Sequence, residues 1–208
     1  MSIDFHQLVL SRRSIRKFMS QAVSNEDLVL ILEAARLAPS GTNRQPWRFV
    51  LLTEAPDREK IAGAVIQPFV IEAPAVFVCC IDKGAFTRGL VEQRLSELVD
   101  AGAVSREAAG IIYRRKMPDK VEDVVIPGFA YLDLGIAIEH MVLQATALGL
   151  GSCWVRLFNP DQVHESLSLS PEMEVVALLP VGYPAETPLP RPRFSSAQIL
   201  LKAGSTIL

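Results

Sequence analysis

Cysteine and histidine are scarce in this chain, which has three of each among its 208 residues. Cys79, Cys80 and Cys153 form no CxxC pair, and an odd number of cysteines at this spacing does not make a disulfide framework. The three histidines stand apart, without the HxxxH or HExxH spacing of a zinc site. The sequence therefore predicts neither a disulfide-stabilised domain nor a metal centre.

An excess of charge of one sign is also lacking. The chain has 21 basic and 23 acidic residues, a net charge of −2 and a pI near 6.0. No general positive field therefore attracts nucleic acid or an anionic membrane. No apolar run approaches the roughly 20 residues of a spanning helix. The first residues carry Asp4 and lack the basic and apolar regions of a secretory signal. We expect a cytoplasmic protein that binds neither nucleic acid nor a membrane.

Hydrophobic residues, by contrast, make up half of the chain, which is enough for a substantial core. Apolar positions repeat at helical spacing over 24–38 and 130–149, and Pro39 and Gly149 stand where these helices are expected to end. Short β-rich runs predict strands at 47–53, 74–82, 152–158 and 173–184. Interleaved helices and strands indicate an α/β or α+β fold, in a single domain that spans residues 1–208.

Two segments differ from the rest in composition. Residues 83–128 are more charged and are predicted to form a variable helical excursion with two exposed helices. Residues 184–194, "PAETPLPRPRF", contain four prolines and cannot continue a regular element. We therefore predict that residues 184–208 form an extended arm on the surface.

The stretch "SRRSIRKF", residues 11–18, concentrates positive charge near the N-terminus. Guanidinium groups bind phosphate oxygens two at a time and are easily desolvated, so this stretch is a candidate phosphate site. Taken alone, a solvated basic face is the favoured interpretation. The same holds for Arg191 and Arg193, which taken alone belong to a solvated tail.

Two further stretches are candidate ligand loops. "APSGTNRQPW", residues 38–47, offers hydroxyls and amides around Gly41, where the backbone can approach a ligand closely. A purely structural interpretation is equally good, because Pro39 and Gly41 end a helix and Pro46 forces an extended chain. "GLGSCWV", residues 149–155, lacks the context of a dinucleotide fingerprint and taken alone is a helix end that leads into a strand.

The order of these stretches along the chain is more specific than any one of them. Arg-Arg-Ser-x-Arg, then Pro-Ser-Gly-x-Asn-x-Gln-Pro-Trp, then Gly-Leu-Gly-x-Cys-Trp and finally Arg-x-Arg resemble the nitroreductase family of FMN-dependent oxidoreductases. The resemblance covers most of the chain except roughly 83–128. It implies an α+β fold, a three-layer sandwich whose mixed, mostly antiparallel central sheet is flanked by helices. It also implies an intertwined homodimer with FMN at the interface.

The resemblance also assigns roles to residues. Arg12, Arg191 and Arg193 would bind the FMN phosphate, with Arg13 and Ser14 beside the ribityl–phosphate end. Arg16 would lie near the pyrimidine edge of the flavin and tune it, and a backbone N–H near Arg156 would face its N5 atom. The implied cofactor-binding set is Arg12, Arg13, Ser14, Arg16, Pro39, Ser40, Gly41, Asn43, Gln67, Cys153, Trp154, Val155, Arg156, Arg191 and Arg193.

Some of these assignments follow the family pattern, and others depart from it. Ser40, Gly41 and Asn43 would reach the cofactor from the partner subunit, as in the family. Gln67 is only the nearest amide to a position where some members carry a polar flavin contact. Arg156 stands where some members carry an acidic residue. Around the middle segment, Tyr113, Arg114, Arg115 and Phe129 are candidates for a wall or lid over the flavin, although a solvated face is favoured for 114–116.

The activity implied by the resemblance is hydride transfer from NADH or NADPH through FMN N5 to nitro compounds, quinones or related electron-poor acceptors, with ping-pong kinetics. No side chain is needed as nucleophile or general acid–base. Deiodinase-like and flavin-fragmenting members of the same superfamily are alternatives, and so is a flavin-binding module without turnover.

Overall fold

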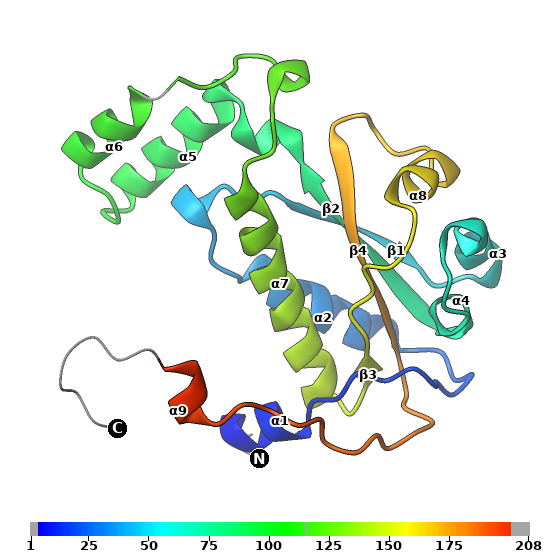
Figure 1. Cartoon of the computed structure of the whole chain (residues 1–208). Coiled ribbons are helices and arrows are strands. Elements are labelled where there is room, and N and C mark those ends of the chain that lie inside the picture. The colour runs from blue at the N-terminus through cyan, green and yellow to red at the C-terminus, as the bar shows by residue number, and fades with distance from the viewer. Residues whose placement is uncertain (1–3, 115, 201–208) are drawn as a thin grey trace.

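A computed structural model describes residues 4–114 and 116–200 (Figure 1). The strands are β1 (Trp47–Leu52), β2 (Ala75–Asp82), β3 (Gly151–Ser152) and β4 (Met173–Gly182). The α-helices are α1 (Phe5–Ser11), α2 (Asn25–Arg36), α3 (Ala55–Glu59), α4 (Phe69–Glu72), α5 (Arg88–Asp100), α6 (Arg106–Tyr113), α7 (Gly128–Ala147), α8 (Pro160–Ser166) and α9 (Ser196–Ile199). Short 3-10 turns are η1 (Gly41–Asn43), η2 (Ala62–Ala64), η3 (Lys83–Phe86) and η4 (Val121–Asp123).

The central sheet has the strand order β1-β2-β4-β3, and each of its ladders is antiparallel. The register between β2 and β4 shifts at Cys79 and Cys80, which marks a local irregularity of the sheet. One parallel bridge, between Ser14 and Ser152, adds the N-terminal segment to the β3 edge. The prediction of a mostly antiparallel α+β sheet is confirmed.

Both faces of the sheet are covered by helices, and β2 is therefore buried along its whole length. Phe77 and Ile81 face a cluster that includes Ile31 of α2 and Leu134 of α7. The alternate residues Val76, Val78 and Cys80 face a second cluster, which includes Val70 of α4 and Val163 of α8. Figure 1 shows these helix layers on either side of the sheet, as expected for a three-layer sandwich.

Helix α7 packs on the face of the sheet that carries Phe77 and Ile81, and eight of its residues are buried. Its predicted end is confirmed: Gly149 has a φ of +77°, and its N–H donates to Thr146 O at 3.0 Å. The N–H of Leu150 donates to Ala145 O at 2.8 Å. This pair of bonds is the Schellman motif, in which glycine adopts the left-handed conformation at little cost. The chain is thereby turned from α7 directly into β3.

The strand predicted over 152–158 is wrong beyond Ser152. Within 152–158 only the β3 residue Ser152 is in a strand, and the next residues pair with β4 through one hydrogen bond from Cys153 to Pro180 and an isolated bridge between Val155 and Leu178. The apolar pattern of this stretch arises because Cys153 and Val155 belong to the second core cluster while the residues between and after them are more exposed. A short irregular edge segment and a true strand share this alternation.

The two segments of unusual composition lie away from the sheet (Figure 1). Helices α5 and α6 form within 83–128, although they are not fully exposed, because Val91, Leu95 and Ala109 are buried. The described part of the C-terminal segment has no regular element over 184–194, as expected, and then forms α9, which was not predicted; residues 201–208 of the predicted arm lie outside the described residues. Ser195 and Gln198 form a capping box that starts this helix. In the described part of the chain, no helix has the length and apolar character needed to cross a membrane.

Candidate functional site

The N-terminal basic segment is bound to the β3 edge by its backbone. Ser14 bridges Ser152, and the N–H of Ile15 donates to Ser152 O at 2.9 Å. Ile15 is buried against Gly151, where an added Cβ would lie 2.5 Å from Ile15 Cγ1. Glycine is therefore required at 151 by close approach. The two stretches "SRRSIRKF" and "GLGSCWV", which are far apart in the sequence, meet here.

Charge gathers at this junction around Cys153. Burial raises the pKa of the Cys153 thiol, and the nearby negative charge of Glu186 adds to the rise, while the positive charges of Arg16 and Arg12 and a hydrogen bond with Ser14 oppose it. Arg12, Ser14 and Arg16 are thus brought together beside the turn after α7. An arrangement of two guanidinium groups and a hydroxyl can bind an anionic group.

The other basic residues of this stretch point elsewhere. The Arg13 guanidinium turns back onto α1, and its Nη1 donates to Leu10 O at 2.6 Å and to Arg12 O at 2.9 Å. Lys17 is exposed. Of the basic side chains in 12–17, only those of Arg12 and Arg16 are among the charges that act on Cys153.

The C-terminal arm begins against the same segment. Phe18 bridges Pro184, the N–H of Ala185 donates to Lys17 O at 2.9 Å, and Glu186 Oε1 accepts from the N–H of Arg16 at 2.6 Å. Residues 184–186 therefore run antiparallel to 16–18. In the view of Figure 1 the arm then runs toward α1.

The two arginines of the arm lie beyond its root, which is the stretch 184–186 that pairs with 16–18. Arg191 and Arg193 are exposed, and neither forms an ion pair with another described residue. Arg193 Nη1 donates only to the neighbouring Pro192 O, at 3.0 Å. The structure thus gathers Arg12 and Arg16 but not Arg191 and Arg193, whose role at a phosphate stays a prediction.

The backbone after β3 presents an open edge. The N–H and C=O groups of Val155 pair with Leu178 at 2.9 and 3.0 Å, and the N–H of Cys153 donates to Pro180 O at 3.3 Å. Because backbone direction alternates along an extended chain, the N–H groups of Trp154 and Arg156 face away from β4. Within 4–114 and 116–200 they donate to no backbone or side-chain acceptor. A ligand with acceptor atoms fits this edge.

Gln67 lies on a segment that approaches the same edge. Val65 bridges Phe158, and the N–H of Asn159 donates to Ala64 O at 2.8 Å. The Gln67 side-chain Oε1 is buried and has no hydrogen-bond partner among the described residues. A buried acceptor without a partner is costly, and such groups commonly mark a ligand position. A ligand that donates an N–H fits here.

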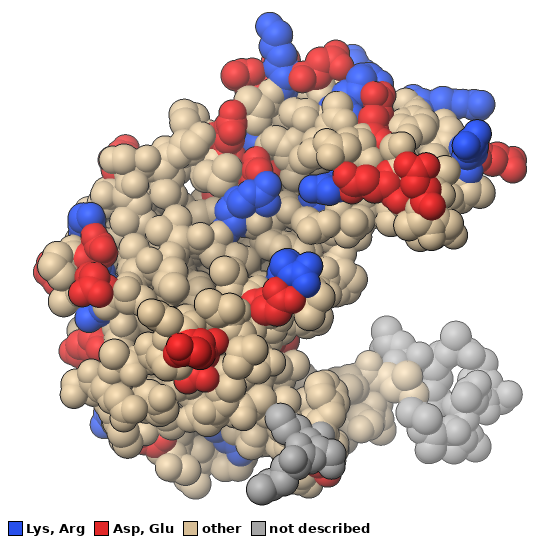
Figure 2. Space-filling model, turned by 180° about the vertical axis from the view of Figure 1, so that it is seen from behind, with Lys and Arg blue, Asp and Glu red and all other residues tan. Residues whose placement is uncertain are grey.

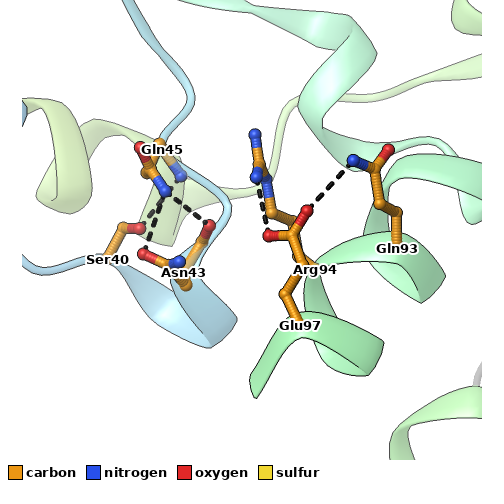
Figure 3. Close-up of polar contacts among 6 residues, drawn as sticks. All are labelled: Ser40, Asn43, Gln45, Gln93, Arg94 and Glu97. Carbon is orange, nitrogen blue, oxygen red and sulfur yellow. Dashed lines mark hydrogen bonds and ion pairs between the residues drawn. The ribbon is translucent and has the colours of Figure 1, made fainter. Parts of the chain in front are cut away.

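The loop 39–47 is a second, separate part of the predicted site. Ser40 Oγ accepts from the N–H of Gln45 at 3.0 Å, and Asn43 Oδ1 accepts from Gln45 Nε2 at 3.1 Å (Figure 3). Thr42, Asn43 and Gln45 have φ values between +50° and +53°, a backbone region that residues other than glycine rarely adopt. Three such residues within four positions indicate a strained loop, and such strain concentrates at functional sites.

The position of this loop separates it from the basic segment. The N–H of Gly41 donates to Oδ1 of Asp133, in the first half of α7, at 3.1 Å. The turn that leads to Ser152 begins at Leu148, at the other end of α7. At about 1.5 Å per residue, the two anchor points on α7 are about 20 Å apart along the helix. Pro39, Ser40, Gly41 and Asn43 therefore do not meet Arg12 and Arg16 within one chain.

Several residues near these two parts were not singled out by sequence reasoning. Asp133 is buried and holds Gly41, and its place inside an apolar run of α7 was the signal that could have revealed it. Arg44 stacks on the rings of Phe86 and Phe129. Tyr131 donates to Glu174, which raises the pKa of Tyr131, while the nearby charge of Arg156 opposes the shift.

Of the lid residues proposed from the sequence, Tyr113 ends α6 and its hydroxyl donates to Glu92 O of α5 at 3.4 Å. Arg114 is exposed, and Arg115 lies outside the described residues. Phe129 is 45% exposed and packs on Phe86 with ring centroids 5.9 Å apart. Phe129 is therefore the member of this set that lies in an aromatic wall.

Comparison with known proteins gives matches over most of the chain. The family model described as "Nitroreductase family" matches residues 9–183. The chain is 32% identical over 206 residues to an NADH dehydrogenase of Thermus thermophilus, with 96% of each chain covered. It is 30% identical to a 5,6-dimethylbenzimidazole synthase of Rhodospirillum rubrum, with 86% of this chain and 82% of that protein covered.

The fold has a matching solved structure as well. It is similar, with a TM-score of 0.79 and 25% identity, to the crystal structure of a putative nitroreductase from Exiguobacterium sibiricum in complex with FMN. The match covers 98% of this chain and 99% of the other.

Proposed function

The chain belongs to the nitroreductase family, and from this premise we propose that it is an FMN-dependent NAD(P)H oxidoreductase. Its acceptors are nitro compounds, quinones or related electron-poor molecules. The observation that carries the proposal is the junction at β3, where Arg12, Ser14 and Arg16 adjoin a backbone edge that lacks protein partners. The names of the Thermus protein and of the Exiguobacterium complex support the donor and the cofactor.

FMN fits the groups that this junction offers. Bound FMN would supply the redox chemistry between NADH or NADPH and the acceptor, and donor and acceptor would use the site in turn. Arg12 would bind the phosphate, and Ser14 would lie along the ribityl–phosphate end. Arg13 would reach the same end only after its guanidinium leaves Leu10 O and Arg12 O. The antiparallel start of the arm leads Arg191 and Arg193 of the same chain back toward Arg12, where they close over the phosphate.

The remaining groups of the junction orient and tune the flavin. The backbone N–H groups at Trp154 and Arg156 bind the edge that carries N5, with Cys153 and Val155 holding this segment against β4. The Gln67 amide accepts from the ring system. Arg16 places a fixed positive charge where negative charge develops on reduction, which stabilises the reduced form.

A homodimer completes this site. In one chain the loop with Pro39, Ser40, Gly41 and Asn43 lies at the other end of α7, so the loop of a partner subunit supplies these contacts. Large apolar side chains are exposed on α1, α2 and α7, and contiguous patches of this kind mark interfaces. They are Phe5, Val9, Leu10, Val29, Leu30, Leu32, Leu37 and Leu132.

The shape of the molecule agrees with such an assembly. Figure 2 shows charged side chains gathered on the α5–α6 segment and a surface that is hollowed between this segment and the C-terminal arm. In the proposed dimer, residues 83–128 act as a wall or lid beside the cofactor bound by the partner, and residues 184–208 act as an arm.

The experiment that tests this function measures cofactor and half-reaction separately. We expect the purified protein to be yellow, to release FMN on denaturation, and to lose the colour of oxidised flavin rapidly when NADH or NADPH is added without oxygen. A protein that is colourless and cannot be reconstituted with FMN contradicts the proposal. A flavin that is bound but is not reduced by either nucleotide contradicts the hydride-transfer activity.

The same preparation separates the alternatives. A flavin-fragmenting enzyme consumes its own flavin in the presence of oxygen, so FMN is not recovered intact. A deiodinase-like enzyme releases iodide from an iodinated aromatic, and a flavin-binding module shows no turnover with nitroaromatics or quinones. We expect intact FMN and steady turnover with nitroaromatics or quinones.

A further inference from the structure

A pocket lies beside the loop 39–47, away from the junction at β3. It is an open pocket with a volume of about 320 Å³, and it is bordered by the loop, η3, the α5–α6 segment and the start of α7. Most of its wall is apolar, and the lining includes Phe86, Val91, Ile112, Met117, Val124 and Phe129. This size and character suit a small organic ligand with a flat apolar body.

Arg44 gives one wall of this pocket its positive charge. Its guanidinium carbon lies 5.1 Å from the ring centroid of Phe129 and 5.7 Å from that of Phe86. Contacts of this kind hold a cation against apolar surface. The planar fork of a guanidinium can meanwhile bind a carboxylate with two parallel hydrogen bonds.

Among the described residues that line the pocket, Arg44 and Lys116 are basic and Asp123 is acidic, so the sum of their charges is positive. Asp133 lies next to Gly41 but is buried behind the loop and does not line the pocket. Because most of the lining is apolar, a charge in the pocket acts in a medium of lower dielectric than water. An anionic ligand is therefore favoured over a neutral one of the same shape.

The loop also connects the pocket to the chemistry. Arg44 directly follows Asn43, which the proposed function assigns to the FMN of the partner subunit. Helix α5 packs against the same turn, and Figure 3 shows Arg94 and Glu97 of α5 facing the loop. A ligand in this pocket borders the cofactor only if the proposed dimer forms.

We propose that this pocket selects an electron-poor aromatic acceptor that carries a carboxylate, with Arg44 as the specificity-determining residue. The inference rests on the proposed function. The aromatic ring packs between Phe86, Phe129 and the apolar side chains of the α5–α6 segment, which removes apolar area from water. The carboxylate binds the Arg44 guanidinium, and this contact directs the opposite end of the ring out of the pocket.

The test compares two acceptors of nearly the same shape, 4-nitrobenzoate and 4-nitrobenzamide, on the same preparation of the FMN-loaded dimer. The ratio of their kcat/KM values cancels differences in FMN content and in folding between variants. We expect the native protein to favour the carboxylate by about 10-fold or more, as one charged hydrogen-bond pair supplies. The carboxylate ring is the less electron-poor of the two, so intrinsic reactivity opposes this result.

Variants identify the residue. We expect Arg44→Gln to lower the ratio by about 10-fold and Arg44→Lys to lower it by less, since lysine keeps the charge but lacks the planar fork. Arg106→Gln removes an exposed positive charge from α6 outside the pocket and serves as the control, with an unchanged ratio. A native ratio near one, or an Arg44→Gln ratio equal to the native ratio, overturns the assignment.

Two further measurements keep this inference apart from the proposed function. Calorimetric titration of the oxidised dimer with each compound, without NAD(P)H, measures the carboxylate preference independently of turnover. No preference in a protein whose flavin is reduced normally rejects the pocket assignment and leaves the function intact. If Arg44→Gln instead slows flavin reduction by NADPH but not by NADH, the pocket binds a donor phosphate and the acceptor assignment is wrong.

Discussion

The two basic segments of this chain, 12–16 near the N-terminus and 191–193 on the C-terminal arm, have similar composition and opposite structural settings. The first is bound to β3 through Ser14 and Ile15, and Ile15 is only 6% exposed. The second follows a root that ends at Glu186, and the apolar residues that flank it, Leu189 and Phe194, are 84% and 76% exposed.

This difference separates a preformed half of the proposed phosphate site from an adaptable half. The backbone near Arg12 is already ordered by the sheet edge, so binding there costs little conformational entropy. The arm has to be ordered by the ligand or by a partner subunit. The contact of Arg12 therefore stabilises the complex at little cost in conformational entropy, whereas the contacts of Arg191 and Arg193 are reduced by the entropy lost when the arm is ordered.

The largest effect is expected from a substitution at Gly151, the residue on which Ile15 of the preformed half packs. Gly151→Val introduces a side chain where even a Cβ would lie 2.5 Å from Ile15 Cγ1. Overpacking of this kind lowers the free energy of unfolding by about 1–3 kcal/mol, and we expect FMN to be lost with it. Urea denaturation and flavin content measure the two effects. The control is Gly89→Ala in α5, where an added Cβ meets nothing within 4 Å. Equal stability of the two variants would refute the docking argument.

The next effect tests the two halves against each other on FMN affinity. Arg12→Gln and Arg193→Gln should each weaken FMN binding by about 1.5–3 kcal/mol, the contribution of a hydrogen bond to a charged group. Fluorescence titration of the apoprotein measures both dissociation constants, with Lys17→Gln as the control because Lys17 is exposed. Unchanged affinity in both arginine variants removes the phosphate assignment.

Mixed dimers of these two variants decide which chain supplies the arm. We expect no recovery of FMN binding when the Arg12→Gln and Arg193→Gln subunits are combined, because the antiparallel root directs each arm toward its own N-terminal segment. Recovery of half of the sites would mean that the arm serves the partner subunit.

A smaller effect is expected at the root that joins the two segments. Glu186→Gln keeps the shape of the acceptor of the Arg16 N–H but removes its charge. We expect a loss of about 0.5–1 kcal/mol in the free energy of unfolding, since a neutral acceptor forms a weaker hydrogen bond. Hydrogen exchange at the Arg16 amide should also become faster. An amide that exchanges at the native rate shows that this contact does not hold the arm.

The smallest effect concerns the pKa of the Cys153 thiol. Burial raises the pKa of Cys153, and the charges of Arg16 and Arg12 oppose the rise, so Arg12→Gln should raise this pKa further. Arg193→Gln should leave it unchanged. The rate of alkylation of Cys153 between neutral and alkaline pH, followed by peptide mass spectrometry, measures the pKa. The same shift in both variants indicates that the arm lies as close to Cys153 as Arg12 does.

The sequence by itself determined the long helices, three of the four strands and the family, whereas the short helices α1, α3, α4, α8 and α9 were not predicted. Helix α7 and its glycine end, and strands β1, β2 and β4, were predictable because hydrophobic periodicity and capping are properties of short stretches of chain. The family was predictable from the order of four stretches. The strand predicted after Ser152 is wrong because strand formation depends on pairing with a neighbour, and that segment pairs with β4 only through a hydrogen bond from Cys153 and an isolated bridge at Val155.

Tertiary structure alone decided how the candidate site is divided. Nothing local to Gly41 indicates that Asp133 holds it at one end of α7, while Ile15 packs on Gly151 beyond the other end. The stacking of Arg44 on Phe86 and Phe129 likewise joins residues from three separate segments. Such contacts result from the packing of the whole chain, because the positions of side chains from distant segments are set by the core between them and not by their own neighbours in sequence.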